Sequence, residues 1–115
     1  LGTIDVLKTI FSGARNYTGG VTLDANATFA VAATTIGVLS NHATSQAVTL
    51  PEATGTGRCV QVDAVNTGVA VVGGGVGDNT IAAGVSAATY TVTAGAGKAF
   101  FDQATDVWYV LSGCP

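Results

Sequence analysis

The stretch RCVQVDAVNTGVAVVGGGVGDNTIA, residues 58–82, decides the expected fold. Its first part alternates between apolar and more polar side chains, as a half-buried β-strand does. The side chains expected on the inner face are Val60, Val62 and Ala64, and those on the opposite face are Cys59, Gln61 and Asp63. The turn Asn66–Gly68 leads into a second β-branched segment, and the glycine-rich loop 73–79 leads into a third.

The same pattern continues outward in both directions along the chain. Val48 and Leu50 alternate before a Pro/Gly turn region, and 89–93 and 107–111 are further β-branched and aromatic segments. Within these segments, alternation predicts Tyr90, Val92 and Tyr109 to face the core. Short strands at roughly 8 to 12 residue spacing predict an all-β fold, a small antiparallel β-sandwich or barrel of jelly-roll-like type.

Residues 1–20 differ from the rest and are expected to form an N-terminal arm or a short helix, followed by a β-sandwich domain over 21–115. Four apolar residues have the i, i+3, i+6 and i+7 spacing of one helical face: Ile4, Leu7, Ile10 and Phe11. An extended arm, or simply a first strand of the main sheet, fits the same residues. The chain begins with Leu rather than Met, so a mature product of a longer precursor is one interpretation.

Charged residues make up only 10% of the chain, against roughly 25% in ordinary soluble domains. The net charge of -3 and the scattered Lys and Arg residues argue against a nucleic-acid partner. No apolar run approaches the roughly 20 residues of a membrane-spanning helix, so no membrane partner is expected. With 7% aromatic residues the core must be thin, and unprotected strand edges favour assembly into an oligomer.

The sequence lacks the residue patterns of common active sites, and we expect neither an enzyme nor a cofactor. The glycine loop 73–77 does not complete a dinucleotide fingerprint, and Gly97-Lys98 lacks the Ser/Thr of a phosphate loop. His42, the single histidine, lies in a polar loop with no Asp or Cys beside it. The Asp residues near strand ends are read as turn residues, and the spacing of Asp78, Asn79 and Asp102 matches no calcium loop, so no metal site is predicted.

Cys59 and Cys114 are the two cysteines. Two small, half-buried thiols are one interpretation, because free cysteine is often found buried. A disulfide between the strand of Cys59 and the C-terminus, within or between subunits, is the second. Metal binding is the third, and the sequence leaves all three open.

Residues 45–111 resemble a β-domain found in virion proteins of tailed bacteriophages. The resemblance is carried by Ser45–Arg58 (SQAVTLPEATGTGR), by the GDNTI turn at 77–81, and by Phe101-Asp102 followed by WYVL at 108–111. The short length and the N-terminal segment make the chain more similar to capsid decoration (cement) and head-fibre proteins than to long fibres. The resemblance covers a little over half of the chain and does not separate head from tail.

The resemblance implies a structural protein on the capsid surface of a virion, made in the host cytoplasm, that stabilises the assembled capsid without catalysis. The implied partners are the major capsid protein and two further copies of this chain in a homotrimer. The arm residues Ile4, Leu7, Ile10 and Phe11 are the expected capsid contacts. A receptor- or glycan-binding fibre domain is the alternative, with stacking surfaces drawn from Tyr90, Phe100, Trp108 and Tyr109. A small hydrolase or lyase is a third hypothesis, and no nucleophile or acid/base set supports it.

Overall fold

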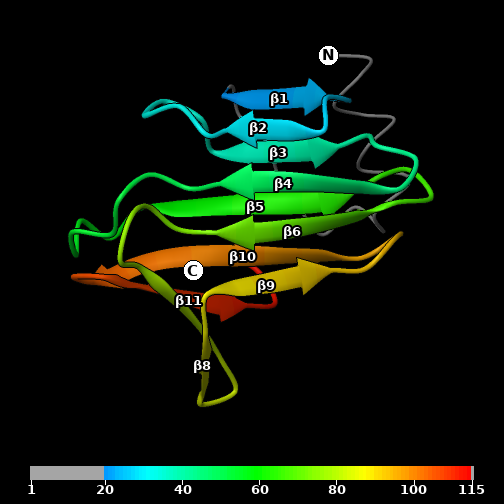
Figure 1. Ribbon diagram of the computed structural model, residues 1–115. Coiled ribbons are helices and arrows are strands. Elements are labelled where there is room, and N and C mark those ends of the chain that lie inside the picture. Colours follow the sequence, from blue (N-terminus) through cyan, green and yellow to red (C-terminus); the bar gives the residue numbers. More distant parts are fainter. Residues whose placement is uncertain (1–19, 115) are drawn as a thin grey trace.

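A computed structural model describes residues 20–114, and this part of the chain folds into β-strands (Figure 1). The strands, in chain order, are β1 (Val21–Asp24), β2 (Thr28–Ala30), β3 (Gly37–Ser40), β4 (Ser45–Thr49), β5 (Cys59–Ala64), β6 (Val69–Gly73), β7 (Asn79–Ala82), β8 (Val85–Ala87), β9 (Thr89–Val92), β10 (Gly97–Ala104) and β11 (Val107–Leu111). Within residues 20–114 there is no helix long and apolar enough to cross a membrane.

The strands form two sheets that face each other. The larger sheet has the order β1-β3-β5-β10-β11-β7-β8, and the smaller one has the order β2-β4-β6-β9. The predicted all-β, two-layer architecture is therefore confirmed, as a sandwich and not as a closed barrel. The segments 1–19 and 115 lie outside the described residues, so the predicted arm remains a prediction.

The first six strands wind as a coil, because each strand lies in the opposite sheet from the one before it. β1, β3 and β5 pair in parallel in the larger sheet, and β2, β4 and β6 pair in parallel in the smaller one. Val21 pairs with Gly37, and Gly37 pairs with Gln61 one turn further along. Figure 1 shows the turns of the coil stacked from β1 and β2 toward β5 and β6.

The remaining strands close the lower end of this coil. β9 pairs antiparallel with β6, and β10 pairs antiparallel with both β5 and β11. β11 then lies parallel to β7, and β8 folds back on β7 as an antiparallel hairpin. Pairing is thus mixed, and our expectation of antiparallel pairing throughout is corrected. A parallel pair needs a long return connection, which here is a strand in the opposite sheet.

The core between the sheets is mostly Val, Leu and Ala. Its two largest fully buried side chains are Trp108 of β11 and Phe100 of β10. The alternation predicted for β5 is confirmed, since Val60, Val62 and Ala64 belong to the core cluster. The thin aliphatic core that the composition predicted is therefore supplemented by two aromatic rings, both from the closing strands.

One inward-facing residue was predicted wrongly. Tyr109 is half-buried and is not part of the core cluster, whereas its neighbours Trp108 and Val110 pack into that cluster or against it. The alternation itself holds, but its phase is shifted by one residue. Alternation sets only that neighbouring side chains face opposite ways, and the pairing of Trp108 with Asp102 fixes which of them faces the core.

Candidate functional site

Three regions of the described chain have features that packing alone does not require: the edge of the coil at β1 and β2, an acidic cluster formed by three loops, and a loop anchored on Asp102. The edge is the candidate interaction surface. The acidic cluster is the candidate ligand site. The Asp102 loop and the disulfide hold the scaffold on which both are built.

The coil has an uncovered end among the described residues, because β1 pairs only with β3 and β2 only with β4. Each of these edge strands therefore presents one row of backbone groups without a strand partner in residues 20–114. Leu23 of β1 is 56% exposed. The chain enters the described domain at this end, where the Gly20 carbonyl accepts a hydrogen bond of 2.9 Å from the Ile36 amide.

Asp24 is the one ionisable side chain in these two edge strands, and it is engaged locally. Its Oδ1 atom accepts hydrogen bonds from the Asn26 amide at 2.9 Å and from Gln46 Nε2 at 2.7 Å. Its Oδ2 atom accepts one from Asn26 Nδ2 at 3.0 Å. The carboxylate therefore fastens the β1–β2 turn to β4. The edge has no lysine or proline of the kind that discourages strand addition.

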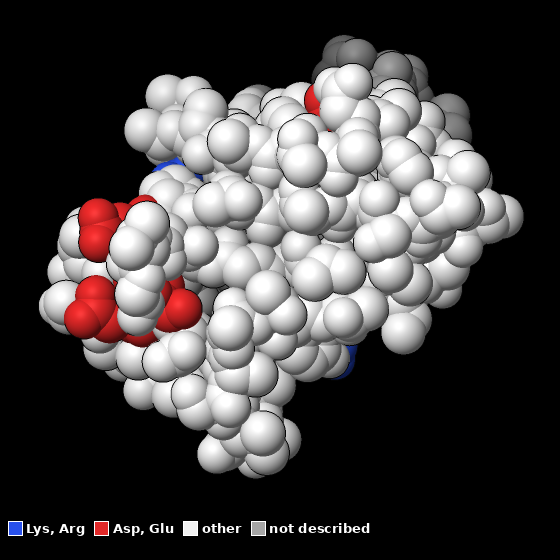
Figure 2. All heavy atoms as spheres, in the orientation of Figure 1, with Lys and Arg blue, Asp and Glu red and all other residues white. Residues whose placement is uncertain are grey.

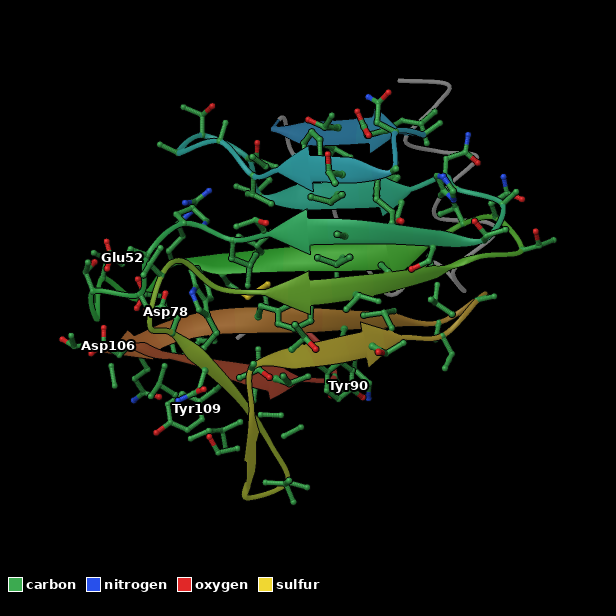
Figure 3. The ribbon with its side chains drawn as sticks, in the orientation of Figure 1. Glu52, Asp78, Tyr90, Asp106 and Tyr109 are labelled. Atoms are coloured by element: carbon green, nitrogen blue, oxygen red, sulfur yellow. A yellow bond between two sulfur atoms is a disulfide. The ribbon has the colours of Figure 1, made fainter. Side chains whose placement is uncertain are left out.

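At one side of the sheets, where the strands end, three loops bring the carboxylates of Glu52, Asp78 and Asp106 together. One oxygen of each lies within 4.8 Å of those of the other two. Figure 3 labels all three at the same end of the sheets, and Figure 2 shows red acidic atoms gathered on the surface there. The residues come from the loops β4–β5, β6–β7 and β10–β11, so they are far apart in sequence.

Backbone hydrogen bonds lock these three loops to one another. Asp78 Oδ2 accepts from the amides of Ala53 at 2.7 Å and of Gly75 at 3.0 Å. The Asp106 amide donates to the Ala53 carbonyl at 3.1 Å, and the Asn79 amide donates to the Asp106 carbonyl at 2.9 Å. The loops are thus held in place independently of any ligand.

Trp108 and two glycines complete this packing. Trp108 Nε1 donates to the Pro51 carbonyl at 3.0 Å. A Cβ atom on Gly74 would lie 2.5 Å from the Asp78 Cβ, and one on Gly75 would lie 2.9 Å from the Glu52 Cα. These glycines are therefore required for the close approach of the loops. The glycine-rich loop 73–77, which does not form a dinucleotide fingerprint, thus allows the loops to pack closely.

Asp102 of β10 holds the loop that follows Pro51. Its carboxylate accepts hydrogen bonds from the Gly55 amide at 2.7 Å, the Thr54 amide at 3.0 Å and the Thr56 hydroxyl at 2.9 Å. Burial acts to raise the pKa of Asp102, but these hydrogen bonds outweigh it, and the pKa lies below its usual value. Asp102 was predicted to be a local turn residue, and instead it bonds to residues 46 to 48 positions away.

Arg58 closes the same loop from its other side. Its guanidinium donates to the carbonyls of Ala32 and Thr35, which follow β2. Burial lowers the pKa of Arg58, and the charge of Asp102 partly opposes this effect. The loop 51–58 is therefore bound to β10 through Asp102 and to the segment that follows β2 through Arg58.

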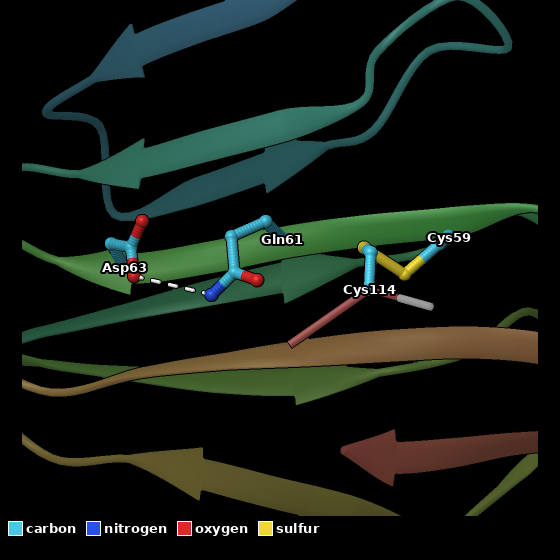
Figure 4. Close-up of a disulfide and its surroundings, with 4 residues drawn as sticks. All are labelled: Cys59, Gln61, Asp63 and Cys114. Atoms are coloured by element: carbon cyan, nitrogen blue, oxygen red, sulfur yellow. Dashed lines mark hydrogen bonds between the residues drawn. A yellow bond between two sulfur atoms is a disulfide. The ribbon is translucent and has the colours of Figure 1, made fainter. Parts of the chain in front are cut away.

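Cys59 and Cys114 form a disulfide with a Cα–Cα distance of 5.9 Å (Figure 4). The sequence had left free thiols and a disulfide open, and the structure contains the intrachain disulfide. The bond ties the C-terminal segment to β5, on the face that also carries Gln61 and Asp63. Gln61 Nε2 donates to Asp63 Oδ1 at 3.3 Å on this face, and both residues are buried.

The aromatic residues considered for ligand stacking do not form a shared platform. Phe100 and Trp108 are fully buried. Tyr90 packs edge-on against Phe100, with ring centroids 6.1 Å apart and an interplanar angle of 70°. Tyr109 lies on the opposite face of β11 from Trp108 and is labelled apart from Tyr90 in Figure 3.

His42 orders a turn between β3 and β4. Its Nδ1 atom accepts hydrogen bonds from the amides of Thr44 and Ser45, both at 3.1 Å. The expected loop position is confirmed, although the ring is half-buried. An acceptor at Nδ1 places the proton of the neutral ring on Nε2.

The remaining candidate residues of the sequence analysis, Ile4, Leu7, Ile10 and Phe11, lie outside the described residues. The cluster of Glu52, Asp78 and Asp106 was not predicted, because the sequence grouped Asp78 with Asn79 and Asp102 instead. No spacing signal could have found it, because the cluster is created by contacts among three loops. Comparison of this chain with models of protein families, with curated proteins and with solved structures found no match.

Proposed function

We propose that this protein is a structural, non-catalytic component of a bacteriophage virion, a decoration protein that binds the assembled capsid and stabilises it. The observation that carries the proposal is the open edge at β1 and β2, where two strands lack outer partners among the described residues. The resemblance of residues 45–111 to phage virion β-domains supplies the biological setting.

The physical argument rests on how stacked β-structures end. A coil of stacked strands buries its core by contact between successive turns, so a terminal turn requires a cap or a partner. Within residues 20–114, the β1–β2 edge combines backbone groups that have no strand partner with the exposed side chain of Leu23. Such a surface can be buried against another protein with little charge-desolvation cost, because its one carboxylate is already hydrogen-bonded.

The partner in this proposal is the major capsid protein, and the protein acts as a homotrimer. Binding to the assembled lattice but not to free coat protein stabilises the capsid by mass action. Residues 1–20 contribute contacts through Ile4, Leu7, Ile10 and Phe11, since the chain enters the described domain at the open end.

The glycan-binding alternative has less support from the side chains. It requires exposed aromatic faces, and two of the four candidate rings are fully buried while Tyr90 packs against one of them. Adsorption of the purified protein to host cells would favour this alternative over the proposed role.

The test is co-sedimentation of the purified protein with phage capsids assembled without it, alongside free coat protein. Leu23→Lys should weaken capsid binding at least about tenfold, because it places an unpaired charge in the interface. It should change the free energy of unfolding by no more than about 0.5 kcal/mol, since the side chain is exposed. Deletion of residues 1–20 should abolish binding while the β-domain stays folded.

Val85→Lys is the matched control. Val85 is 68% exposed on β8, the opposite edge strand of the same sheet, and its substitution should leave capsid binding unchanged. Loss of capsid binding in Val85→Lys but not in Leu23→Lys would place the interface at β8 and would contradict the proposal. Light scattering of the wild-type protein measures its molar mass and so tests the proposed trimer.

A further inference from the structure

The acidic cluster contains a buried oxygen atom without a partner. Asp78 is 7% exposed, and its Oδ1 atom is buried with no hydrogen-bond partner, whereas Oδ2 accepts two amide hydrogen bonds. Leaving a polar atom buried and unpaired is costly, and more so when the group is charged. The cluster of Glu52, Asp78 and Asp106 places two further carboxylates beside this side chain.

The arrangement is unfavourable for a protein that binds nothing there. Three carboxylates within 4.8 Å repel one another, and the described residues place no Lys, Arg or His in the cluster. The two exposed members, Glu52 and Asp106, are brought to the buried Asp78 by loops that are fixed through their backbones. A bound cation would satisfy the buried oxygen and neutralise the repulsion at the same time.

We propose that Glu52, Asp78 and Asp106 bind a calcium ion. The ligand atoms are all carboxylate oxygens, which suit hard cations, and the absence of sulfur or imidazole ligands from the cluster disfavours zinc. Calcium accepts six to eight oxygen ligands in irregular geometry, with water completing the shell, whereas magnesium demands a nearly ideal octahedron. Ligands that come from three separate loops need not form an ideal octahedron, and calcium tolerates such irregular coordination.

The local backbone supports this assignment. Asp106 has a φ of 63°, a left-handed conformation that Asp and Asn adopt more readily than most residues. Gly74 and Gly75 leave room for the close approach of Asp78 and Glu52. Calcium would join the loops β4–β5, β6–β7 and β10–β11 by direct bonds, in addition to the hydrogen bonds that already connect them. The proposal does not depend on the capsid role, since it concerns loops outside the β1–β2 edge.

The experiment is calorimetric titration of the chelator-treated, full-length protein with calcium chloride, together with thermal unfolding in calcium and in chelator. We expect one site per chain with a dissociation constant of about 10⁻⁴ to 10⁻³ M, the range of weak calcium sites in extracellular modules. The melting temperature should rise as calcium is added. Absence of binding up to about 10 mM calcium would overturn the proposal.

Glu52→Gln and Asp106→Asn are the test variants. Both side chains are exposed, and asparagine tolerates the left-handed backbone at 106, so both variants should fold. Each should weaken calcium binding at least about tenfold and reduce the thermal shift. Asp24→Asn, the matched control, removes the same charge outside the cluster and should bind calcium as the wild type does.

Three results would count against the assignment. Wild-type affinity in both Glu52→Gln and Asp106→Asn would show that calcium binds elsewhere. A loss of calcium affinity in Asp24→Asn as large as in the test variants would show that the net charge of the protein, and not the cluster, determines the affinity. Magnesium binding as tight as calcium binding would overturn the choice of ion.

Discussion

The coil of β1 to β6 and the closing strands β7 to β11 are built from similar Val-, Thr- and Gly-rich sequences, but different interactions hold them together. In the coil, strands pair in parallel with the strand one turn away, and the core is aliphatic. The closing strands contribute both large aromatic core residues, Phe100 and Trp108, and the carboxylates that anchor distant loops.

This difference indicates where stability and interaction reside. The closing strands fix one end of the coil through two large buried side chains, Phe100 and Trp108, and through the hydrogen-bonded carboxylate of Asp102. The other end, at β1 and β2, presents two strand edges that have no outer strand partner within residues 20–114. Substitutions of the fully buried residues in the closing strands should therefore destabilise the domain, whereas substitutions at the open edge should alter binding.

The largest effect is expected at Trp108. Trp108→Ala should lower the free energy of unfolding by about 3–5 kcal/mol, because it leaves a cavity and removes the hydrogen bond to Pro51. Its neighbour provides the control: Tyr109→Ala, on the opposite face, should cost less than about 1.5 kcal/mol. Urea unfolding of both variants measures the contrast, and equal losses would contradict the assignment of Trp108 to the core.

The disulfide should have the next largest effect. It closes a segment with a sequence separation of 55, and loop-closure entropy in the unfolded chain predicts a stabilisation of about 4 kcal/mol, which is commonly reduced to about 2–4 kcal/mol in practice. The double variant Cys59→Ser/Cys114→Ser should lose that amount in denaturant unfolding. Adding a reductant should lower the stability of the wild type similarly and leave the variant unchanged. A wild type insensitive to reduction would contradict this prediction.

Asp102 should have a smaller, pH-dependent effect. Asp102→Asn should cost about 1–3 kcal/mol at pH 7, because an amide replaces the ionised acceptor of the Thr54 and Gly55 amides. Since the folded-state pKa of Asp102 is lowered, the carboxylate stabilises the fold fully above its ordinary value of 3.8, and this stabilisation is lost as the pH falls through the lower folded-state pKa.

The measurement for Asp102 is unfolding of wild type and variant at neutral pH and below about pH 3. The difference in stability between the two proteins should shrink in acid. A difference that stays constant with pH would show that the ionised form of Asp102 is not what holds the loop 54–56.

Much of the fold was predictable from local patterns. The alternation in RCVQVDAV assigned Val60 and Val62 to the core, and the positions of the Gly-rich turns placed most strands. Tyr109 was assigned to the wrong face, because alternation does not fix its own phase. Parallel pairing was missed for a related reason: a strand that pairs in parallel has the same local pattern as one that pairs antiparallel.

Composition and two-residue periodicity act locally, and they were enough to predict an all-β protein that is poor in charge and thinly packed. Three features became apparent only in the folded chain: successive strands alternate between two sheets, Cys59 meets Cys114, and Glu52, Asp78 and Asp106 converge. These features depend on contacts between residues about 16 to 55 positions apart, for which the local sequence carries no signal. The physical reason is that the coil and its closing strands fix the loops in space, and the loops then bring the acidic side chains together.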